Sequence, residues 1–137
     1  MFSWKDYFEL AKKLRVPSNG TNLIEAELRS SISRAYYSIY HDSEEFCKIS
    51  QINIPAEIIR NNKPEKSSHL RLISALKNYK HDSRVRNAGN FLDTLRNWRD
   101  SADYDNPFKG NINTKSADTV DYVDQIYNDF NNILKGY

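Results

Sequence analysis

The chain has 137 residues, of which 39% are hydrophobic, and carries 20 basic against 18 acidic side chains. This length suits one domain with one core, and a net charge of +2 is too balanced for a protein that coats nucleic acid without specificity. No apolar run approaches the roughly 20 residues of a membrane span, the first residues lack a signal-peptide pattern, and the single cysteine, Cys47, excludes an internal disulfide. We therefore expect one soluble, cytoplasmic domain over residues 1–137.

Helical periodicity predicts a first helix over residues 3–14 and a long second helix over residues 22–49. Ser3 is a suitable N-cap for the first helix, and the Pro-Ser-Asn-Gly segment at residues 17–20 predicts a break after it. The second helix carries an apolar stripe that predicts its buried face: Leu28, Ile32, Ala35, Ile39 and Phe46.

The second half of the chain also favours helices. Residues 50–66 contain two prolines and an Asn-Asn pair, which predict a loop with one turn of helix at residues 56–59. Two further helices are expected over residues 67–79 and 83–102, and a last one begins at Ser116. Because no run of alternating β-branched residues competes, we predict an all-α fold, a bundle of four to five helices.

Arg34 and His41 stand seven residues apart in the segment Arg-Ala-Tyr-Tyr-Ser-Ile-Tyr-His. At about 100° per residue they share one helix face, about 180–200° from Ile32, together with Tyr37 and Ser38. Arginine matches phosphate oxygens, and histidine, with an ordinary pKa near 6.5, suits a general base. This combination is typical of metal-independent RNA cleavage, and a solvated helix face is the alternative.

A second polar group lies in the segment Leu-Arg-Asn-Trp-Arg-Asp-Ser-Ala-Asp-Tyr that ends at Tyr104. Arg96 and Arg99 each precede an aspartate by four residues, at Asp100 and Asp103, so both pairs favour ion pairs on a helix surface.

Three histidines are spread widely along the chain. His69 stands at a predicted helix start, where a surface or capping histidine is the alternative to a site residue, and His81 lies in a turn. With no cysteine partner and no His-x-x-x-His spacing, a zinc site is not expected and no metal cofactor is implied.

Together, the segment from Arg34 to His41 and the segment that ends at Tyr104 resemble the HEPN family, small all-helical prokaryotic proteins that cut RNA or act with nucleotides. The resemblance covers residues 4–104. It implies that Arg34 binds phosphate and that His41 is the general base or acid, at an interface between two copies. It further implies supporting or substrate-binding roles for a second set of residues: Tyr37, Ser38, His69, Arg96, Arg99 and Asp103.

This resemblance supports a first hypothesis, a metal-independent endoribonuclease. It would act as a cofactor-free homodimer in a toxin–antitoxin or phage-defence setting and leave a 2′,3′-cyclic phosphate. The second hypothesis is a catalytically inactive module that binds nucleotide, RNA or a companion nucleotidyltransferase. Ala35 favours the second, since HEPN ribonucleases usually have a polar residue after the arginine, whereas the Arg34–His41 spacing favours the first. A structural dimerisation domain is the third alternative.

Overall fold

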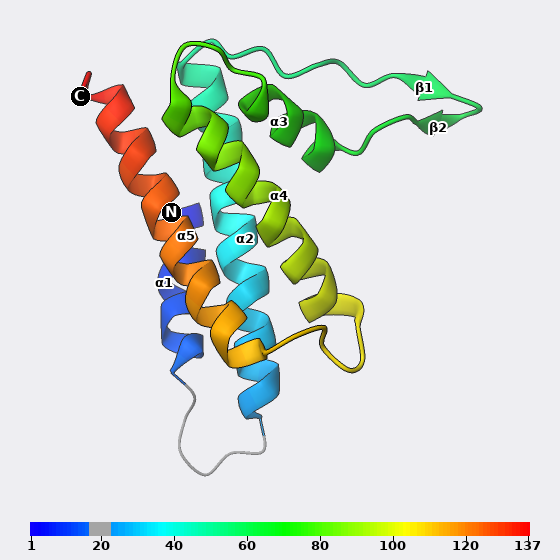
Figure 1. Cartoon of the computed structure of the whole chain (residues 1–137), viewed down its shortest axis with the longest axis vertical. Helices are drawn as coiled ribbons and strands as arrows, with labels where there is room; N and C mark the ends of the chain where they lie inside the picture. The colour runs from blue at the N-terminus through cyan, green and yellow to red at the C-terminus, as the bar shows by residue number, and fades with distance from the viewer. Residues whose placement is uncertain (17–22) are drawn as a thin grey trace.

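The computed structural model describes residues 1–16 and 23–137, which form five helices and a two-stranded sheet (Figure 1). In chain order these are α1 (Trp4–Arg15), α2 (Ile24–Ile49), β1 (Ile59–Arg60), β2 (Lys63–Pro64), α3 (Ser68–Lys77), α4 (Ser83–Tyr104) and α5 (Ile112–Leu134). The predicted all-α helical bundle is therefore confirmed. No helix in the described ranges is long and apolar enough to cross a membrane. The break predicted at residues 17–20 and the helix start predicted at residue 22 lie outside the described residues.

Helix α2 is the centre of the bundle and packs against α1, α4 and α5. The apolar stripe predicted for this helix is buried along its whole length. Burial extends beyond the stripe to Tyr36, Tyr40, Ser31 and Ser43, because three neighbouring helices cover more of α2 than one apolar face requires.

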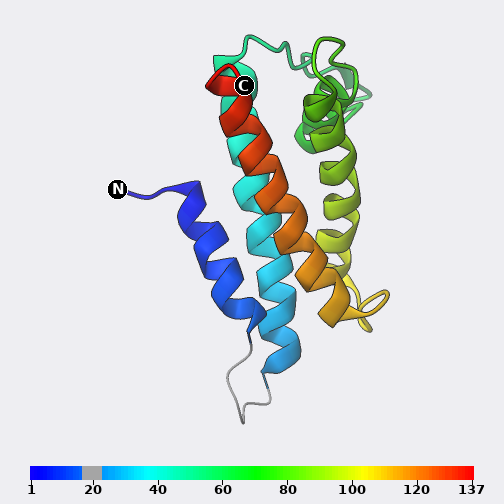
Figure 2. The same cartoon turned by 60° about the vertical axis from the view of Figure 1, so that its left-hand side comes forward.

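One side of α2 is left uncovered between α1 and α4. In the described part of the chain α5 contacts both of these helices, whereas α1 and α4 do not contact each other. Figure 2 shows α1 on one flank of the bundle and α4 on the other, with α2 and α5 between them. We call this side the open face of α2; its partly exposed residues are Ser30, Ser33, Arg34, Tyr37, His41 and Glu44.

The helical turn predicted at residues 56–59 is wrong, because this segment is extended and leads into a hairpin. Strand β1 pairs antiparallel with β2, and the turn residues Asn61 and Asn62 have φ angles of 53° and 62°. Asparagine tolerates this left-handed conformation better than most residues. The hairpin projects from the bundle beside α3 (Figure 1).

Side-chain caps mark the starts of α1, α3, α4 and α5, whereas Leu23 before α2 makes no capping hydrogen bond. Ser3 caps α1 as predicted, accepting a hydrogen bond from the backbone of Lys5. The predicted start of the last helix at Ser116 is wrong, because Asn111 caps α5 one turn earlier through the backbone N–H of Thr114. Ser116 is instead buried inside the helix.

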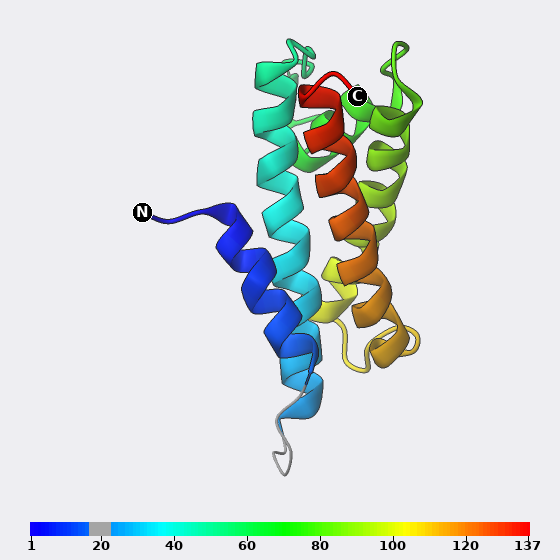
Figure 3. The ribbon, with the colours of Figure 1, turned by 90° about the vertical axis from the view of Figure 1, so that its left-hand side faces the viewer.

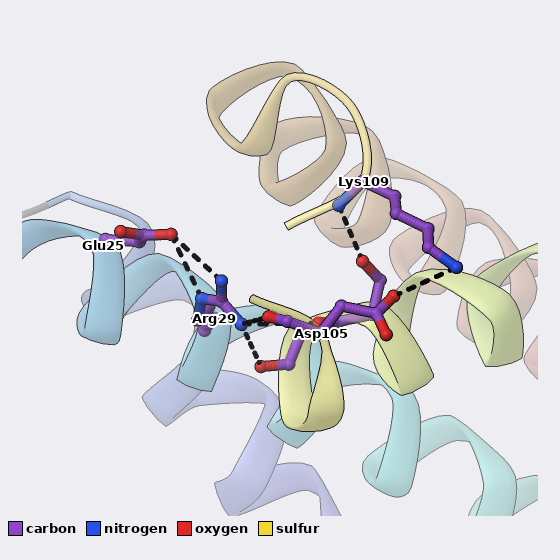
Figure 4. Close-up of polar contacts among 6 residues, drawn as sticks. Glu25, Arg29, Asp105 and Lys109 are labelled. Carbon is purple, nitrogen blue, oxygen red and sulfur yellow. Dashed lines mark hydrogen bonds and ion pairs between the residues drawn. The ribbon is translucent and has the colours of Figure 1, made fainter. Parts of the chain in front are cut away.

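The end of α4 is tied to α2 by Arg29 (Figure 4). Its Nη1 donates to the backbone carbonyls of Ser101, Ala102 and Asp105, at 3.4, 3.1 and 2.6 Å. The last carbonyls of a helix have no partner within the helix, so Arg29 supplies donors that α4 lacks. Glu25 accepts from Nε and Nη2 and holds the guanidinium in place. These contacts fix the position of α4 along α2.

Candidate functional site

Arg34 and His41 lie on the open face, side by side with the aromatic residues of α1. The guanidinium carbon of Arg34 is 5.4 Å from the ring centroid of Tyr7. The imidazole of His41 stacks on the indole of Trp4, with ring centroids 3.7 Å apart and planes inclined by 16°. Both side chains are partly exposed, so neither points into the apolar stripe of its own helix.

A carboxylate orients the imidazole of His41. Glu44 Oε1 lies 2.9 Å from His41 Nδ1, one helical turn further along α2. In a neutral ring Nδ1–H donates to the carboxylate, and the lone pair is left on Nε2. Glu44 and Trp4 were not among the candidate site residues predicted from the sequence. The spacing of three residues between His41 and Glu44 was a usable signal for the first, and nothing in the sequence pointed to the second.

Two surface hollows adjoin the Arg34–His41 pair. One, of about 580 Å³, is bordered by His41, Glu44 and the first residues of the chain. The other, of about 260 Å³, has apolar walls from Leu10 and Leu14 of α1 and is lined at one side by Arg34. Seven residues of helix separate the two side chains by about 10 Å along the axis. Arg34 and His41 of one copy are therefore not in contact with each other.

Arg99 of α4 packs on α2 beside the open face. Its guanidinium carbon lies 5.2 Å from the ring centroid of Tyr36 and 5.3 Å from that of Tyr37, a cation–π arrangement. Nη2 is 3.0 Å from a carboxylate oxygen of Asp100, and Nη1 is 3.9 Å from one of Asp103. The predicted pairing of residues 99 and 103 is present. The pairing predicted between residues 96 and 100 is wrong, because Asp100 turns to residue 99.

His69 of α3 is held against α2 by two tyrosines. Its Nδ1 is 2.6 Å from the hydroxyl of Tyr36, and its ring stacks on Tyr40 at 4.1 Å. Burial, followed by the charges of Arg99 and Arg96, lowers the pKa of His69. The imidazole is therefore neutral near pH 7, and its Nδ1 accepts a hydrogen bond from the hydroxyl of Tyr36, whose own pKa is raised by burial.

The rings of His41 and His69 both contact the ring of Tyr40. Tyr40 makes an edge contact with His41, at 5.0 Å between ring centroids, and stacks on His69. Ser33, also on the open face, donates to Asp103 at 3.3 Å. The structure thus gathers most of the predicted residues on or beside the open face of α2: Arg34, Tyr37, His41, His69, Arg99 and Asp103.

Ser38 does not belong to this face. Its side chain is fully buried and shares a hydrogen bond with the hydroxyl of Tyr127 on α5. The predicted placement of Ser38 on the exposed face with Arg34 and His41 is therefore wrong. Ser38 lies only about 40° from Arg34 around the axis of α2, but this rotation turns it towards Tyr127 of α5.

The fold and the site define a helical bundle with an arginine and an oriented histidine on an open helix face. Among the described residues, no group of three or more His, Cys, Asp or Glu side chains is placed to hold a metal ion. In comparisons with known proteins, no family model, curated protein or solved structure matches this chain.

Proposed function

We propose that this chain is a HEPN-type, metal-independent endoribonuclease that acts as a homodimer. The observation that carries the proposal is the hydrogen bond of 2.9 Å between His41 Nδ1 and Glu44 Oε1, on the face that Arg34 shares. An imidazole fixed by a carboxylate in this way presents Nε2 as a base, as in other catalytic histidines.

The chemistry depends on these two groups. His41 Nε2 accepts the proton of a ribose 2′-hydroxyl while that oxygen attacks the adjacent phosphorus. Arg34 stabilises the charge that develops on the phosphate oxygens. The bond from phosphorus to the 5′-oxygen breaks, and the leaving oxygen takes a proton from solvent, to which the His41 imidazolium later returns the proton that it accepted. The products are a 2′,3′-cyclic phosphate and a 5′-hydroxyl, and no metal or cofactor takes part.

The distance between Arg34 and His41 supports a dimer. A two-fold axis through the open face near Tyr37, which lies about midway between them, brings Arg34 of each copy towards His41 of the other. Tyr37 is partly exposed on this face, and tyrosine and arginine are enriched in protein interfaces. A toxin–antitoxin or phage-defence setting, with an antitoxin or nucleotidyltransferase as partner, is the context that this function implies.

The second candidate is a HEPN module that binds RNA or nucleotide without cutting it. Ala35, which follows Arg34, is fully buried and has no polar side-chain group that could contact a substrate. Trp4 also covers one face of the His41 ring. Both observations favour binding over catalysis.

The test is RNA cleavage in the presence of EDTA, with the product ends identified. We expect wild-type protein to leave 2′,3′-cyclic phosphates, and His41→Gln and Arg34→Gln to lose activity by about 100-fold or more. Two matched controls, His81→Gln and Arg15→Gln, change exposed residues away from the open face and should keep the wild-type rate. Circular dichroism checks that each variant is folded.

Two outcomes contradict the nuclease. One is folded wild-type protein that cuts none of a varied set of RNAs; the other is cleavage that survives in both site variants. If RNA still binds and binding needs Arg34, the second candidate takes its place.

A further inference from the structure

A cavity of about 190 Å³ lies between α3 and the extended segment that leads into the hairpin. Its walls combine charged, polar and apolar groups: Pro55, Ala56, Ile58, Glu65, Lys66, Arg71 and Ser74. Neither the segment from Arg34 to His41 nor the end of α4 contributes to it. The cavity is therefore separate from the open face of α2, and any ligand that it binds is independent of the proposed nuclease.

Arg71 lines this cavity and has donors without a partner among the described residues. Its Nη1 donates to the backbone carbonyl of Pro55 at 3.2 Å. Its Nε is buried and has no hydrogen-bond partner among the described residues, a state that costs free energy unless a ligand or water fills it. With Nη1 engaged, Nε and Nη2 form the free edge of the guanidinium, which is the edge that binds two oxygens of a phosphate.

The charges around Arg71 also favour an anion. No carboxylate in the described part of the chain pairs with Arg71 or Lys66, both of which line the cavity. The single acidic residue in the lining, Glu65, lies 3.7 Å from Arg60 Nε and is compensated there. Two cations thus face one carboxylate that already has its own partner.

Ser74 adds a neutral donor. Its Oγ accepts a hydrogen bond of 3.2 Å from the side-chain amide of Asn78, which leaves the hydroxyl proton available to a ligand. The rest of the lining is apolar and comes from Pro55, Ala56 and Ile58, all of which are exposed.

We propose that this cavity binds a phosphomonoester group, held by the free edge of Arg71, the ammonium of Lys66 and the hydroxyl of Ser74. Three donor groups match the three terminal oxygens of a phosphomonoester. The volume is below the roughly 300–1,000 Å³ of sites that enclose drug-sized ligands, so the cavity takes the phosphate and leaves the rest of the molecule outside. A mononucleotide and the 5′-phosphorylated end of an RNA both carry this group.

The experiment titrates the full chain with inorganic phosphate, using sodium chloride at equal ionic strength as the reference, and follows NMR signals. The Nε–Hε signal of Arg71, identified by its loss in Arg71→Gln, should shift and saturate, together with the amide signals of residues 66–74. AMP, and an oligoribonucleotide with or without its 5′-phosphate, then distinguish the two sources of the group.

Charge variants test the assignment in both directions. Arg71→Gln and Lys66→Gln should each weaken phosphate binding by about tenfold or more, and Glu65→Gln should tighten it by removing a repelling charge. Lys63→Gln changes a hairpin lysine that does not line the cavity and should bind like wild type.

Absence of a saturable shift with phosphate and AMP overturns the proposal. So does equal affinity of wild-type protein and Lys66→Gln. The Lys66 variant is decisive if Arg71→Gln disturbs the fold by losing the bond to Pro55, because the exposed side chain of Lys66 has no bond to any other described residue.

Discussion

The imidazole of His41 lies flat against the indole of Trp4, 3.7 Å away between ring centroids. Trp4 belongs to the first turn of α1, which inclines away from the other helices towards the N-terminus (Figure 3). Trp4 also makes an edge contact with Tyr7, the ring under Arg34. Residues of α1, outside the segment from Arg34 to His41, thus contact both Arg34 and His41.

Trp4→Ala should lower the free energy of unfolding by about 1–3 kcal/mol, because it removes a stacked pair and part of the α1–α2 contact. Trp4→Phe keeps a ring over His41 and should recover much of this loss. Urea unfolding followed by circular dichroism measures both. Equal stability of the alanine variant and the wild type would mean that the stack contributes nothing to the fold.

Arg29→Gln should destabilise the protein by about 2 kcal/mol, because three carbonyls at the end of α4 lose a charged donor (Figure 4). Glu25→Gln is the matched control. Its carboxylate is exposed and pairs with Arg29 along the same helix, so the expected loss is about 0.5 kcal/mol or less. The comparison uses midpoints of chemical unfolding. Similar losses in both variants would contradict the role given to the α4 carbonyls.

Stability should depend on pH through His69. Its pKa is lower in the folded chain than the ordinary value of 6.5, so the unfolded chain binds this proton more readily. The free energy of unfolding should therefore fall as pH drops below about 6.5, and this loss is absent at higher pH. His69→Gln, which keeps an acceptor for Tyr36, should flatten the dependence between pH 7.5 and 5.5. The exposed His81→Gln should leave the dependence as it is in wild type.

Gly89→Ala should destabilise the bundle, although alanine is the better helix former by about 1 kcal/mol. A Cβ at Gly89 would lie 2.7 Å from the backbone nitrogen of Lys77 and 3.1 Å from Leu76 Cβ, where α3 and α4 approach closely. Asn90→Ala, at an exposed position one residue further along α4, should be neutral or stabilising. The midpoints of thermal unfolding of the two variants, compared with that of the wild type, test this prediction. A stabilised Gly89→Ala would show that α3 can move away at little cost.

The local sequence pattern was sufficient to predict much of the fold. The spacing of Leu28, Ile32 and Ile39 predicted the buried face of α2, and the cap at Ser3 was correct. The start of α5 was missed because residues 113–115, in its first turn, are polar and therefore indicated a continuation of the preceding loop. The hairpin was missed because strands of two residues are too short to show an alternating pattern.

The candidate site was predictable only within single helices. Helical geometry alone placed Arg34 and His41 on one face of α2, since that depends on neighbours in sequence. Which side of α2 stays open depends on where α1, α4 and α5 pack, and this decided that Tyr37 stays partly exposed while Ser38 is buried. Trp4 on His41 and His69 on Tyr40 likewise join residues far apart in the chain. The sequence by itself determined the helices and the shared face, because both follow from local periodicity; the tertiary structure decided the partners, because long-range packing has no local signal.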